Sequence, residues 1–192
     1  MPRAAGRRAR AGSGTAREVT LRARKIRLLV VDVDGVLTDG RVAIDGTGRE
    51  VRTFSDADRT GIGLLRRAGI DVVGLASRRT VARAAYVRYL GLAAVVIGGG
   101  RGHDVVRARC RRGRIALDAV AYVGHDVLEL PLAAAVGLAI AVADGSDQLR
   151  RRAHWVTARR GGGDVVREVA ETVLRAQGKW ASTVGEVWRR WD

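Results

Sequence analysis

Short runs of apolar residues recur along this chain, and glycines or polar residues follow most of them. Runs this short do not make helices of their own and are typical of strands that are buried on both faces of a sheet. The predicted strands are residues 28–31, 70–75, 93–97, 120–123, 138–142 and 154–157.

Between these strands the apolar positions follow a helical spacing, and several of the segments end at a glycine, as helices commonly do. The predicted helices are residues 62–68, 80–90, 103–112, 130–136 and 165–177. Strands that alternate with helices of this size indicate a parallel sheet covered on both faces. We therefore expect a Rossmann-like, doubly wound α/β fold with a mostly parallel sheet.

Residues 41–44 and 49–54 break this rhythm, because they alternate apolar and polar positions on either side of Asp45-Gly46. An Asp-Gly turn between two short alternating segments predicts a β-hairpin. The hairpin follows the first strand closely, so we expect it to form a flap over that strand's end.

The chain ends with an apolar helical stripe made by Val184, Val187, Trp188 and Trp191. A short terminal helix must bury such a stripe on its own domain or on another chain, and we favour a contact with another subunit. These patterns divide the chain into a disordered Arg-rich arm (1–24), one α/β domain (25–179) and a Trp-rich C-terminal tail (180–192).

Composition changes this picture little. A chain of 192 residues with 47% hydrophobic content suits one domain with a substantial core. The formal charge of +15 invites a nucleic-acid interpretation. However, Glu18 alone opposes the arginines of the arm, and no aromatic residues interleave with them. Solvated arginines are therefore favoured, and nucleic acid is not an expected partner.

Cys110 is the only cysteine, so no internal disulfide can form, which fits a reducing cytoplasm. No apolar run is long enough to cross a membrane. We expect a cytoplasmic protein without a membrane partner.

The chemistry begins at the end of the first predicted strand, where Asp32, Val33, Asp34 and Gly35 follow one another. Ligands of open α/β sheets bind beyond the carboxyl ends of the strands. Alternation points Asp32 and Asp34 the same way, and two converging carboxylates repel each other unless a cation or a proton relieves them. This strand end is therefore a candidate metal or catalytic site.

Later strands deliver further polar groups to the same edge. Ser77 and Arg78 could hold an anionic oxygen, although an ordinary helix cap explains the serine equally well. A glycine-rich loop leads to His103. The last such loop holds His125, Asp126 and Glu129, which could share a divalent ion with the first acid pair.

The string from Asp32 to Gly40 resembles the first motif of the haloacid dehalogenase superfamily of phosphohydrolases, and more narrowly the capless 3-deoxy-D-manno-octulosonate 8-phosphate phosphatases. The resemblance runs from about Lys25 to Lys179. It includes Ala121-Tyr122-Val123-Gly124, Ala141-Val142-Ala143-Asp144 and Ala176-Gln177-Gly178-Lys179.

The resemblance implies a metal-dependent sugar-phosphate phosphatase that works through an aspartyl-phosphate intermediate. Asp32 would be the nucleophile and Asp34 the general acid and base. Mg²⁺, or Mn²⁺ or Co²⁺, would bind Asp32 and the Asp34 carbonyl, with Asp126 and His125 completing the site. Asp58 would lie near the substrate.

The resemblance also implies a sugar phosphate as the ligand, with Ser77, Arg78 and His103 as the phosphate-binding positions. It further implies a homotetramer, in which the segment at Lys179 and Trp180 docks near a neighbouring subunit's site.

Four positions depart from the family pattern. At Ala76 the family's hydroxyl is missing or shifted by one residue, His103 aligns with a lysine, and His125 replaces the usual first metal-binding acid. Arg59 stands where the family has a glycine. Imidazole suits transition metals better than Mg²⁺. Either Asp126 or Glu129 completes the metal site, or another metal is used. The alternative is an inactive relative that serves as a binding or oligomerisation module in nucleotide-sugar (acylneuraminate-like) metabolism.

Overall fold

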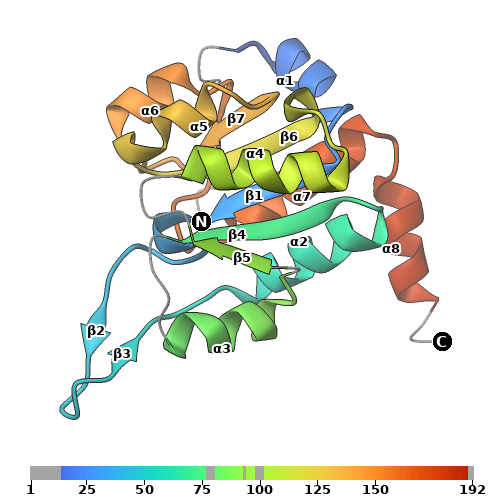
Figure 1. Ribbon diagram of the computed structural model, residues 1–192. Helices are drawn as coiled ribbons and strands as arrows, with labels where there is room; N and C mark the ends of the chain where they lie inside the picture. The colour runs from blue at the N-terminus through green and yellow to red at the C-terminus, as the bar shows by residue number, and fades with distance from the viewer. Residues whose placement is uncertain (1–13, 77–80, 93, 98–101, 190–192) are drawn as a thin grey trace, which may run out of the picture.

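A six-stranded parallel sheet forms the centre of the computed structural model, which describes residues 14–76, 81–92, 94–97 and 102–189 (Figure 1). The strand order is β5-β4-β1-β6-β7-β8, and every neighbouring pair is parallel. The strands are β1 (Leu28–Asp32), β4 (Asp71–Ala76), β5 (Ala94–Ile97), β6 (Val120–Gly124), β7 (Leu138–Ala141) and β8 (Trp155–Val156). The predicted doubly wound sheet is confirmed.

Helices cover both faces of the sheet, because side chains alternate along each strand. Leu29 and Val31 of β1 face one core and Leu28 and Val30 face the other. The first core is covered by α1 (Ala16–Ala23), α2 (Asp56–Arg67), α3 (Val81–Leu90) and α7 (Val165–Ala176). The second is covered by α4 (Gly102–Gly113), α5 (Leu130–Ala133) and α6 (Asp147–Arg152).

Strand β1 lies between β4 and β6, and this position creates the site. Asp32 pairs in register with Leu75, and Val31 pairs with both Gly74 and Val123. The carboxyl ends of the three strands therefore meet at one edge, where the chain reverses its winding direction. Such switch points are where open α/β sheets bind ligands.

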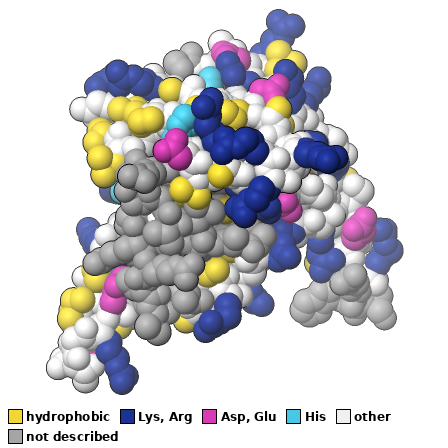
Figure 2. Space-filling model, viewed as in Figure 1, with side chains coloured by type: hydrophobic (Ala, Val, Ile, Leu, Met, Phe, Trp, Pro, Cys, Tyr) yellow, Lys and Arg dark blue, Asp and Glu magenta, His cyan; other side chains and the backbone are white. Residues whose placement is uncertain are grey.

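The expected hairpin is present between β1 and α2, although its strands β2 (Ala43–Ile44) and β3 (Glu50–Val51) are short. It projects away from the body of the molecule (Figure 1). Its apolar side chains gather at the lower left of the space-filling view (Figure 2). Val42, Ile44 and Val51 are 44%, 64% and 50% exposed.

The predicted disordered arm is wrong where it covers residues 16–23, which form α1. Thr15 caps the helix by accepting a hydrogen bond from the Glu18 amide, and Val19 and Ala23 are buried four residues apart. Arg22 also donates to the Gly137 carbonyl at 2.8 Å. The basic composition hid a helix with one apolar face; the first 13 residues lie outside the described part of the chain.

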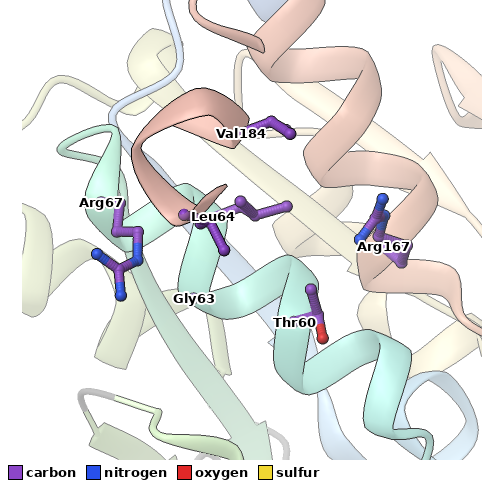
Figure 3. Close-up of a pocket in the computed structure, with 7 residues that line it drawn as sticks. Thr60, Gly63, Leu64, Arg67, Arg167 and Val184 are labelled. Atoms are coloured by element: carbon purple, nitrogen blue, oxygen red, sulfur yellow. The ribbon is translucent and has the colours of Figure 1, made fainter. Parts of the chain in front are cut away.

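The predicted C-terminal tail is the helix α8 (Trp180–Trp188), which packs on α2 and α7 of its own chain. Val184 and Val187 lie partly buried against the core, so this part of the predicted stripe faces its own domain. Trp191 lies outside the described residues. A cavity of about 280 Å³ remains beneath α8, lined by Thr60, Gly63, Leu64, Arg67, Arg167, Val184 and Val187 (Figure 3).

Among the described residues, no helix is both long enough and apolar enough to span a membrane.

Candidate active site

The chain leaves β1 at Asp32 and enters a kinked turn over Val33–Leu37, in which Asp34 and Gly35 depart from helical backbone angles. Gly35 has a φ of 96°, a conformation that side chains disfavour, and this lets the chain turn sharply beneath the site. The buried hydroxyl of Thr38 accepts hydrogen bonds from the amides of Gly35 (3.3 Å) and Gly40 (3.2 Å). These contacts fix the turn that carries the two acids.

His125 brings its imidazole directly onto Asp32. The loop after β6 places the His125 Nδ1 atom 2.9 Å from Asp32 Oδ2 and 3.4 Å from Glu129 Oε1. Glu129 also accepts a hydrogen bond from the His125 amide at 2.8 Å. The Asp32 and Glu129 side chains are only 11% and 14% exposed, whereas the His125 side chain is 34% exposed. The two carboxylates are therefore shielded from solvent, and the imidazole is partly open to it.

This packing shifts the pKa values of both partners upward. Burial raises the pKa of Asp32 to about 7, and the charges of Glu129 and Asp34 add to that rise. Hydrogen bonds to Asp32 and Glu129 raise the pKa of His125 to about 10. The hydrogen bond between the two side chains opposes the rise in the Asp32 pKa and contributes most to the rise in the His125 pKa. Because two carboxylates contact the ring, we assign the proton of that hydrogen bond to an imidazolium facing an ionised Asp32.

Two glycines make room for this arrangement. A Cβ atom at Gly35 would collide with the His125 ring, and one at Gly124 would collide with the Glu129 carboxylate. The imidazole therefore lies against the backbone of the turn that carries Asp34. A larger residue at Gly35 would displace the His125 ring, and one at Gly124 would displace the Glu129 carboxylate.

The Asp32, His125 and Glu129 ligand atoms lie within 4.8 Å of one another and form a candidate metal centre. Of the predicted ligands, Asp126 lies apart from this group, because its carboxylate caps the next turn by accepting from the Val127 amide at 2.6 Å. The sequence left open whether Asp126 or Glu129 would complete the metal site. Glu129 is the one that lies with Asp32 and His125. Asp126-x-x-Glu129 matches a capping box, a signal that Glu129 folds back.

Asp34, the second acid, is held from the hairpin side. Its Oδ1 atom lies 2.7 Å from Arg52 Nη1, and the Nε atom of Arg52 donates to Glu50. The Arg52 side chain is 4% exposed. Arg52 was not among the predicted site residues, because one basic residue in an Arg-rich chain carries no motif signal.

Of the four remaining predicted site residues, the structure describes Asp58 and His103. Asp58 is 1% exposed and accepts a hydrogen bond from the Arg167 amide at the start of α7. His103 lies in the first turn of α4, where its Nδ1 atom is 3.9 Å from the carboxylate of Asp104. Ser77 and Arg78 lie outside the described residues.

Lys179 and Trp180 contact their own chain. The Lys179 ammonium donates to the Ala68 carbonyl at 3.0 Å. The guanidinium groups of Arg167 and Arg175 lie over the Trp180 ring.

The chain is similar to known phosphatases over most of its length. It is 35% identical over 168 residues to the 3-deoxy-D-manno-octulosonate 8-phosphate phosphatase KdsC of Yersinia pestis, which covers 88% of this chain and 90% of that protein. No family model matches the chain.

Two solved structures are also similar. One is the phosphatase of the same name from Moraxella catarrhalis, in complex with a magnesium ion, a phosphate ion and a KDO molecule. It is 28% identical with a TM-score of 0.84 over 88% of this chain and 98% of that one. The other is the cobalt-bound deoxy-D-mannose-octulosonate 8-phosphate phosphatase of Haemophilus influenzae. It is 30% identical with a TM-score of 0.78 over 82% and 92% of the two chains.

Proposed function

Because the chain belongs to the 3-deoxy-D-manno-octulosonate 8-phosphate phosphatases of the haloacid dehalogenase superfamily, we propose that it hydrolyses the phosphate monoester of a small sugar. The observation that carries this proposal is the placement of Asp32. It ends the central strand, is almost buried, and faces a compact group of polar side chains at the switch point of the sheet.

In this proposal an Asp32 oxygen attacks the phosphorus atom and forms an aspartyl-phosphate, while the bond from phosphorus to the sugar oxygen breaks. Asp34 gives a proton to the departing sugar oxygen. It then takes a proton from the water that attacks the phosphoryl group, which releases phosphate and restores Asp32.

The ligands available to a divalent ion are Asp32, Glu129 and His125, and the His125 ring would have to give up its proton before it could bind the ion. The family resemblance adds the backbone carbonyl of Asp34 as a further ligand. When bound, such an ion would neutralise negative charge on the transferring phosphoryl group. One imidazole among carboxylates suits Mn²⁺ or Co²⁺ better than Mg²⁺. Asp126 would have to release the Val127 amide before it could join this set.

The second candidate is an inactive relative that binds a sugar phosphate or assembles with other chains. The contact between His125 and Asp32 favours it, because the imidazolium occupies the nucleophile's Oδ2 atom and supplies the positive charge that a metal would bring. In that case the cationic ring is a permanent replacement for the ion.

Phosphate release from a panel of sugar phosphates, with Mg²⁺, Mn²⁺ or Co²⁺, separates the two candidates. The phosphatase proposal predicts turnover by the wild type and none by Asp32→Asn. It also predicts that His125→Asp, which restores an oxygen ligand, raises the rate with Mg²⁺. Absence of turnover that depends on Asp32 with every metal would leave only the binding role.

A further inference from the structure

Arg52 is the least exposed member of any ion pair recorded within the described residues, with 4% of its side chain accessible. It comes from the base of the projecting hairpin and reaches the turn after β1. A guanidinium is costly to bury unless charged partners satisfy it. Here the partners are Asp34 and Glu50, which contact its Nη1 and Nε atoms.

The contact with Asp34 is short and well placed to restrict that carboxylate. Arg52 Nη1 lies 2.7 Å from Asp34 Oδ1, the distance of a strong charge-assisted hydrogen bond. A carboxylate on a short side chain rotates freely unless something holds it. Glu50 fixes the guanidinium from its other side, so Arg52 links a strand of the hairpin to the orientation of Asp34.

We propose that Arg52 is a positioning residue, which holds the Asp34 carboxyl group in the orientation needed to give a proton to the departing sugar oxygen and to take one from the attacking water. This inference rests on the proposed phosphatase function. Proton transfer by a positioned side chain contributes about 10²–10⁴-fold to a rate, and a proton donor that rotates away from the leaving oxygen loses much of that contribution.

A comparison of two substrates shows whether Arg52 positions a proton donor or only supports the fold. An alkyl phosphate, such as the best sugar phosphate, needs a proton on its leaving oxygen, whereas the leaving group of p-nitrophenyl phosphate departs without one. We expect Arg52→Ala to lower kcat/KM for the sugar phosphate by about 10²-fold, and for p-nitrophenyl phosphate by less than about threefold. Arg52→Lys, which keeps a charged donor, should recover part of the loss.

Arg49→Ala is the matched control, because Arg49 lies on the same hairpin, is exposed and carries the same charge. It should leave both kcat/KM values unchanged. Thermal melts of each variant establish that it is folded before its kinetics are compared.

A double-mutant cycle with Asp34→Asn tests whether Arg52 acts through Asp34. If it does, adding Arg52→Ala to Asp34→Asn lowers kcat/KM for the sugar phosphate no further. The inference would be overturned if the losses of the two single variants multiplied in the double variant. It would also be overturned if Arg52→Ala lowered kcat/KM equally for both substrates, or changed KM alone. Each of these results would leave the phosphatase proposal standing. A folded wild type that hydrolyses neither substrate overturns both.

Discussion

The imidazole of His125 contacts both buried carboxylates of this site and offsets their mutual repulsion. Asp32 and Glu129 are nearly buried, and the ring of His125 lies between them, 2.9 Å and 3.4 Å from their oxygens. Buried carboxylates need a positive partner. A histidine at position 125, in place of an acid, therefore changes both the charge of the site and the atoms that are available to a metal.

Glu129 and Asp126 should behave differently when each is neutralised. Glu129→Gln removes a charged ligand, so we expect the metal concentration for half-maximal activity to rise at least about tenfold. Asp126→Asn is the matched control, because Asp126 only caps the following turn, and its metal dependence should stay near that of the wild type. Titrations of phosphate release with Mn²⁺ measure both; the reverse order would identify Asp126 as the ligand.

Asp58 predicts how stability depends on pH. Burial raises the pKa of this carboxyl to about 6, against the opposing hydrogen bonds from the Arg167 and Val166 amides. Because the folded state holds the proton more tightly than the unfolded state, the stability that Asp58 contributes is fully present below about pH 4 and is lost as pH rises through 6. Asp58→Asn removes this dependence, so it should gain on the order of 2–3 kcal/mol relative to wild type between pH 4 and 7.

Urea unfolding at several pH values measures this difference. Parallel stability profiles for the wild type and Asp58→Asn would show that Asp58 does not titrate in this range.

At the scale of elements, α2 begins at Asp56, six residues before the predicted start, and packs closely on α7. Gly61 and Gly63 interrupt the helical pattern and explain the late prediction, since glycine disfavours a helix. Ser55 caps the helix by accepting from the Ala57 amide, a start signal that the glycines obscured.

The two glycines of α2 should respond oppositely to alanine. A Cβ at Gly61 would lie 2.8 Å from the Arg167 Cα of α7, whereas one at Gly63 would meet no atom within 4 Å. We expect Gly61→Ala to lower the free energy of unfolding by about 1–3 kcal/mol. Gly63→Ala should raise it by about 0.5–1 kcal/mol, because alanine favours the helix. Chemical denaturation measures both, and equal effects would refute this account of the α2–α7 contact.

The sheet was predictable because its strands are buried on both faces and read as continuous apolar runs. The first acid pair was predictable because a strand end precedes it. The helix over residues 16–23 was missed within arginine-rich sequence, and the contact from Arg52 to Asp34 joins residues that no local pattern links. Contacts that depend on the path of the hairpin can be identified only once the fold of the chain is known.

At the scale of the whole molecule, the projecting hairpin leaves Val42, Ile44 and Val51 exposed, and exposed apolar groups that cluster mark interaction surfaces. The homotetramer expected from the family resemblance stays a prediction, and the hairpin is the surface that we expect to take part in it. We predict an oligomer by light scattering and its dissociation by Ile44→Asp. Leu128→Asp is the control, because Leu128 is 79% exposed but lies after β6. A monomeric wild type would contradict the prediction.

The central claim is that Asp32 carries the phosphoryl group during turnover. Borohydride added while the enzyme hydrolyses its best sugar phosphate would reduce an acyl phosphate at Asp32 to homoserine, which mass spectrometry of the peptide detects. The account predicts this modification at Asp32 of the wild type, dependent on the substrate. Phosphate release with an unmodified Asp32 under the same trapping conditions would contradict it.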